Sequence, residues 1–162
     1  MNEPFPLLRL PPRLVYEFLG PFARCEYALK GAGFAKGNAT SVEADWNKFA
    51  KSIDWHLRRA KEPEFQQAVE FLLAEPPRKQ VLQNGYVRWK DSPPDSNLPK
   101  AERVLLLVRR VRNNLFHGAK VWSPEYGNGA RDRNLIIAAL VVLKGCIRFS
   151  ELVHRAYGEG MF

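Results

Sequence analysis

The chain has 162 residues, of which 46% are hydrophobic and 26% are charged, a composition that fits one globular domain and excludes a disordered chain. Its 25 Lys and Arg outnumber 17 Asp and Glu, so the net charge of +8 predisposes it to polyanions or acidic surfaces. We find neither an apolar run of the roughly 18 residues that a membrane helix needs nor a secretory hydrophobic region. Two cysteines far apart, Cys25 and Cys146, exclude a disulfide framework and a CxxC metal site. We therefore expect a soluble, cytoplasmic protein with reduced thiols.

The first third of the chain predicts an extended lead-in and then a helix. Residues 1–12 are rich in proline, and we expect a single domain over residues 13–162. Apolar residues at helical spacing predict a helix from Leu14 to Lys30. Gly20-Pro21 interrupts this pattern, so either the helix kinks there or the main helix begins at Pro21. Three glycines are expected to end it: Gly31, Gly33 and Gly37.

The middle of the chain predicts two further helices and a long connection. One apolar stripe predicts a helix over Asp45–Arg59, and Pro63 suits the first position of a third helix that Pro76-Pro77 stops. The periodicity is then lost from Pro76 to Pro99, which is longer than most connections within compact domains. This segment is expected to be irregular, with a short hairpin around Gly85 as the alternative.

The last third of the sequence predicts two further helices, one of which is expected at the centre of the bundle. A strong stripe predicts a helix from Ala101 to about His117, followed by a second loop, Lys120 to Ala130. The last helix is expected from about Asp132 to Tyr157, with Gly158 as its cap, and its two adjoining apolar stripes favour a central position. The sum is an all-α, up-and-down bundle of four to five helices with two irregular loops.

Two stretches of the sequence are basic and contain no acidic residue. Arg103 to Lys120 holds five basic residues, and Pro76 to Lys90 holds four. Most runs of charged residues are solvated helix faces. Such faces usually mix acidic and basic residues, whereas these two stretches contain basic residues only. The interleaved aromatic residues either stack on unpaired bases or tuck onto the bundle, and both interpretations stay open. The candidate RNA contacts are Arg88, Trp89, Lys90, Arg109, Arg110 and Lys120, the last of which is equally well a solvated loop residue.

The string from Val111 to Lys120 contains Arg112, Asn113 and His117, and Gly118 follows directly. Asn113 and His117 share a helix face, whereas Arg112 and His117 lie about 140° apart on an ideal helix. They converge only if the helix loosens at Gly118 or the Arg side chain sweeps across Asn113. Histidine titrates near neutral pH and suits proton transfer, while arginine stays charged and binds phosphate oxygens. Taken singly, Arg112 fits an ion pair and His117 a helix C-terminal cap; with Asn113 and Gly118 they predict a catalytic site.

Arg112-Asn113, three further residues and His117-Gly118 resemble the Arg-polar-x3-His signature of HEPN domains (higher eukaryotes and prokaryotes nucleotide-binding). Many of these helical bundles are metal-independent endoribonucleases of toxin–antitoxin and anti-phage systems. The segment from Phe22 to Lys30 is similar to their acidic first-helix segment. The resemblance implies a homodimer, RNA as substrate, and an antitoxin or defence-system protein as a partner. In toxins paired with nucleotidyltransferase antitoxins a Tyr stands two positions after the His, whereas this chain has Ala119, which argues against that type of partner.

The expected function is RNA cleavage by attack of the 2′-hydroxyl on the adjacent phosphate, leaving a 2′,3′-cyclic phosphate. His117 would move protons and Arg112 would stabilise the developing charge. Glu26 shares a face with Phe22, so it points inward, where it either holds Arg112 or forms a structural ion pair with another arginine. The sequence offers no carboxylate and histidine cluster for a metal, and no cofactor is expected. The alternatives are a non-catalytic HEPN-like module that binds RNA or a protein, and a plain basic scaffold.

Overall fold

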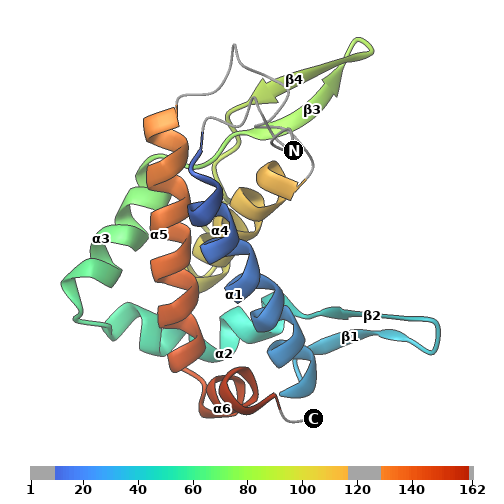
Figure 1. The fold of residues 1–162 in the computed structure, drawn as a ribbon, viewed down its shortest axis with the longest axis vertical. Helices are drawn as coiled ribbons and strands as arrows, with labels where there is room; N and C mark the ends of the chain where they lie inside the picture. Colours follow the sequence, from blue (N-terminus) through green and yellow to red (C-terminus); the bar gives the residue numbers. More distant parts are fainter. Residues whose placement is uncertain (1–9, 117–128, 161–162) are drawn as a thin grey trace.

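The computed structural model describes residues 10–116 and 129–160, which are mostly helical with two small hairpins (Figure 1). The expectation of a helical protein is confirmed, but the purely all-α class is wrong. Within these residues there are six helices, one more than the upper expectation. Four residues singled out from the sequence lie outside the described ranges: His117, Gly118, Ala119 and Lys120. The elements are α1 (Pro12–Gly31), β1 (Ala35–Asn38), β2 (Ser41–Ala44), α2 (Trp46–Arg59), α3 (Pro63–Ala74), β3 (Lys79–Gln83), β4 (Tyr86–Lys90), α4 (Lys100–Phe116), α5 (Gly129–Arg148) and α6 (Glu151–Glu159).

Helix α5 is the centre of the bundle, as its broad apolar surface predicts. It contacts α1, α3, α4 and α6, and Figure 1 shows it running along the length of the molecule. On α5 the residues Ala139, Val142, Leu143 and Cys146 are fully buried. Burial of apolar side chains from every neighbouring helix against α5 is the main stabilising term of the fold. No helix in the described ranges is long and apolar enough to span a bilayer.

Two helices differ from the periodicity-based expectation. Helix α1 runs without interruption from Pro12 to Gly31 and contains Pro21, so the main helix does not begin at Pro21. The expected single last helix is wrong: it divides into α5 and α6, because Ser150 adopts an extended conformation and its hydroxyl accepts a hydrogen bond from the Val153 amide at 3.4 Å. Serine is a favoured N-cap, so it begins a new helix here. Gly158 lies inside α6, and Gly160, at φ +66°, ends it.

The two hairpins arise from turn chemistry. Asn84 and Gly85 both have positive φ, 51° and 79°, which is the geometry that Asn-Gly favours between two paired strands. The hairpin alternative around Gly85 is therefore confirmed as β3–β4. The β1–β2 hairpin was not expected. It follows Gly33, one of the glycines interpreted only as a helix end, and the Asn38 carboxamide closes its turn by accepting from the Thr40 and Ser41 amides.

The start of α4 is tied to α2 by a side chain. The Ala101 amide donates to Asp54 Oδ1 at 2.8 Å, and Arg58 Nε lies 2.7 Å from the other Asp54 oxygen. Asp54→Ala should lower the free energy of unfolding by about 1–2 kcal/mol, since a helix-end amide loses its acceptor. The melting temperature should fall by about 2–8 °C in a fluorimetric melt. Asp54→Asn keeps an acceptor oxygen and should melt closer to the unchanged protein; equal loss in both variants would contradict this role of the bond.

Candidate functional site

Glu26 of α1 and Arg112 of α4 form an ion pair at the side of the bundle. Arg112 Nη2 donates to Glu26 Oε1 at 3.1 Å, and the two side chains are 26% and 32% exposed. The partner of Glu26 was left open by the sequence, and the structure identifies it as Arg112. A pair at this depth contributes only about 0–1 kcal/mol to stability, so its main effect is to fix the direction of the guanidinium.

Two aromatic side chains complete the surroundings of this pair. The indole Nε1 of Trp46, the first residue of α2, donates to the same Glu26 Oε1 at 3.2 Å. The Arg112 guanidinium lies 4.9 Å from the ring centre of Phe22, which in turn stacks on Trp46 at 5.3 Å. Stacking on a ring attracts the cation and restricts its plane. The sequence assigned Phe22 and Trp46 only to core stripes. The periodicity of one helix does not show which residues of another helix its side chains will contact.

Arg109 adds a second positive charge beside this pair. Its guanidinium lies 6.0 Å from the Trp46 ring centre, and within residues 10–116 and 129–160 it forms no ion pair. Burial lowers the pKa of Arg109; the charge of Glu26 raises it in opposition, and the charge of Arg112 lowers it further. We call Phe22, Glu26, Trp46, Arg109 and Arg112 the Glu26–Arg112 cluster. It holds two guanidinium groups and one carboxylate, so it attracts anions.

Arg110 and Asn114 have a different task, which is to hold the β3–β4 hairpin against α4. Arg110 Nη1 donates to the carbonyls of Pro77 at 3.0 Å and Ser92 at 2.7 Å, one on each side of the hairpin. Asn114 Nδ2 donates to the Arg78 carbonyl at 2.9 Å. Arg110 was a predicted RNA contact, but these bonds give it a structural role, and burial lowers its pKa. Asn114 was not predicted, although it falls three residues after Val111 on the same apolar stripe.

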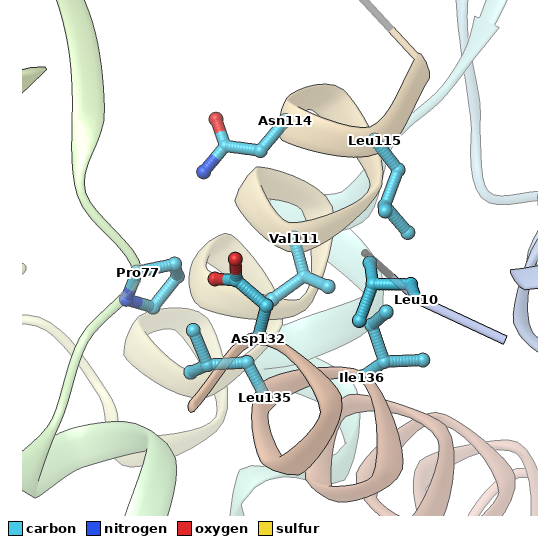
Figure 2. A pocket seen from close by; sticks show the side chains of 8 residues that line it. All are labelled: Leu10, Pro77, Val111, Asn114, Leu115, Asp132, Leu135 and Ile136. Carbon is cyan, nitrogen blue, oxygen red and sulfur yellow. The ribbon is translucent and has the colours of Figure 1, made fainter. Parts of the chain in front are cut away.

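A small cavity lies under the last turn of α4 (Figure 2). Its volume is about 10 Å³, near the lower limit for one water molecule. Asn114 and Asp132, the two buried polar residues of the described chain, lie on the side of Pro77, while Leu10, Leu115 and Ile136 lie opposite. One side of the C-terminal turn of α4, which carries Asn114, is thus packed against α5 and the segment before β3, while Phe116 is 70% exposed. This packing holds one side of the helix end that follows Arg112.

The remaining predicted site residues are dispersed. Asn113 is exposed on α4, and Lys90 is exposed at the end of β4. Arg88 is exposed with its guanidinium 5.6 Å from the Tyr86 ring centre, while Trp89 is half-buried. The structure therefore brings Glu26 and Arg112 together and leaves Arg88 and Lys90 on the hairpin. His117 and Lys120 lie outside the described residues.

The described residues contain no group of three or more His, Cys, Asp or Glu side chains placed to hold a metal ion. What they do provide is a fixed guanidinium with a second cation beside it, the components of a site for a phosphate group. Comparison of the chain with protein-family models, with curated proteins and with solved structures finds no match.

Proposed function

We propose that this protein is a HEPN-like, metal-independent endoribonuclease in which Arg112 and His117 act together. The observation that carries the proposal is the fixed Arg112 guanidinium, held by Glu26 and stacked on Phe22 near the end of α4, five residues before His117. About a quarter of the Arg112 side chain remains exposed to receive a substrate. An arginine that only forms a structural ion pair with Glu26 needs no second cation beside it. A site for a phosphate group, in contrast, binds its anion more strongly when the positive charge of Arg109 lies next to Arg112.

In the proposed reaction the 2′-oxygen of the RNA attacks the adjacent phosphorus. The bond from phosphorus to the 2′-oxygen forms, the bond to the 5′-oxygen breaks, and a 2′,3′-cyclic phosphate remains. A base takes the proton of the 2′-hydroxyl, and an acid gives a proton to the leaving 5′-oxygen. Arg112 stabilises the extra negative charge on the phosphate oxygens. We assign the two proton transfers to His117 of two chains in a homodimer, since each chain supplies one such histidine.

The test is incubation of the purified protein with single-stranded RNA in EDTA. RNA should be cut, and the 5′ fragment should carry a cyclic phosphate, detected as a mass lower by one water than the linear phosphate. DNA of the same sequence should stay intact because it lacks the 2′-hydroxyl. Light scattering on the same sample should give twice the mass of one 18.6 kDa chain. RNA that stays intact in EDTA and in Mg²⁺ would contradict the proposal, and the non-catalytic RNA-binding module would take its place if binding persisted.

A further inference from the structure

A groove runs between α4 and β3, on the side of α4 that carries Arg109 and Asn113. Its volume is about 410 Å³, and none of the residues that line it is acidic. Two of them, Arg110 and Asn114, are already bonded to the carbonyls that flank the hairpin. The polar lining side chains that remain to meet a ligand are Lys79, Gln80, Arg109 and Asn113. They offer two cationic donors and two carboxamides, which suit phosphodiester oxygens.

The β3–β4 hairpin continues from this groove and has two unlike faces. Its antiparallel register pairs Lys79 with Lys90, Val81 with Arg88, and Gln83 with Tyr86. Because side chains alternate along a strand, these six share one face, which is basic and carries an exposed tyrosine. Gln80, Leu82, Val87 and Trp89 occupy the other face and carry no charge. Tyr86 is 66% exposed, and with the Arg88 guanidinium 5.6 Å from its ring centre an exposed part of the ring remains for a base to stack on.

We infer that the groove and the basic face of β3–β4 bind a single strand of RNA, an inference that rests on the proposed function and names its substrate class. Lys79, Arg88 and Lys90 would contact successive phosphates, and Tyr86 would stack on an unpaired base. In a duplex the bases are paired and stacked inside the helix, so no unpaired base would be available to stack on Tyr86. An acidic protein would be attracted by the same charges, but it would not need an exposed aromatic ring among them.

Arg109 connects this surface to the Glu26–Arg112 cluster. The same side chain lines the groove and lies over Trp46, which donates to Glu26. A strand that follows the groove is thereby led toward Arg112. The hairpin is about 17 Å long, so together with the groove it reaches several nucleotides beyond the proposed cleavage site.

The test measures binding of a labelled single-stranded RNA by fluorescence anisotropy in EDTA, with His117→Ala in every protein so that the RNA stays whole. Tyr86→Ala should weaken binding about fivefold or more. Lys79→Gln with Arg88→Gln should reduce the slope of log affinity against log salt by about 1.4, the value for two lost phosphate contacts on a single strand. Two matched controls should bind as the parent does: Tyr16→Ala, a tyrosine 67% exposed on α1, and Lys51→Gln with Arg155→Gln, which removes the same charge elsewhere.

The inference is overturned if the hairpin variants bind like their controls, or if a duplex of the same sequence binds as tightly as the single strand. Its failure is separable from failure of the proposed function. RNA cut by the unaltered protein, together with binding that ignores the hairpin, would contradict this inference alone. Binding that depends on the hairpin, with RNA left uncut, would support this surface and contradict only the nuclease proposal.

Discussion

Replacing Arg112 with Ala should lower the rate of RNA cleavage at least about a hundredfold, and His117→Ala should lower it by about 10² to 10⁴-fold. Removal of Arg112 takes away the cation that is fixed before the phosphate arrives, so the loss falls on the chemical step. The melting temperature should change little, because the Arg112–Glu26 pair is partly exposed and contributes about 1 kcal/mol at most. Initial rates in EDTA and a thermal melt of the same preparations measure both quantities.

Two substitutions sharpen this prediction. Arg112→Lys keeps the charge but loses the planar fork that contacts Glu26 and a phosphate, so it should recover only part of the rate. Arg13→Ala is the matched control, since Arg13 also pairs with a glutamate, Glu17, at 2.7 Å but on the exposed surface of α1. It should cut RNA at the unaltered rate. Cells that express the chain should grow poorly, and Arg112→Ala should relieve this. Cleavage by Arg112→Ala at the unaltered rate would remove Arg112 from the proposed mechanism.

Glu26→Ala should lower kcat about a hundredfold with little change in KM, because in the proposed mechanism Glu26 acts only by positioning Arg112. Without the carboxylate the guanidinium keeps only its stacking on Phe22 and can leave the direction that the reaction needs. Glu26→Gln retains an oxygen that accepts from Arg112 and from Trp46, so it should restore most of the lost rate. Steady-state kinetics on one RNA substrate separates kcat from KM.

The contrast between the two Glu26 variants distinguishes positioning from a general structural role. A merely structural carboxylate would change the melting temperature of both variants and leave kcat alone. If Glu26→Ala cleaves RNA as fast as the unaltered protein, Glu26 does not position Arg112. Trp46→Phe removes the other donor to the same oxygen and should have a smaller effect than Glu26→Ala.

The helices were predictable where apolar residues recur at one spacing, and the break before α6 shows the limit of that signal. The stripe that includes Leu135, Cys146 and Val153 keeps its helical period across the break, so hydrophobicity alone indicates one long helix. Ser150 ends α5 and begins α6 through a hydroxyl cap, a local interaction that the period does not record. The β1–β2 hairpin was missed for a similar reason, since its strands are nearly all exposed and leave no apolar alternation.

The sequence predicted which residue types form the site and which helix face each of them occupies, but not which side chains of different helices would meet. The inward direction of Glu26 follows from its place on α1, but its partner is 86 residues away and depends on how α1 meets α4. Arg109 and Arg110 show why charge runs are hard to interpret. They are neighbours in the chain and differ by about 100° around the helix, so Arg109 lies over the Trp46 ring and Arg110 donates to the carbonyls that flank the hairpin.

The two cysteines are both fully enclosed, and burial raises the pKa of each thiol. Since the thiolate is the reactive form, Cys25 and Cys146 are protected from alkylating reagents while the bundle is folded. A cysteine introduced at Leu82, which is 75% exposed near the tip of the hairpin, would then be the one thiol that takes a maleimide dye. The native fold thus permits a fluorescent reporter on this arm without removal of either native sulfur.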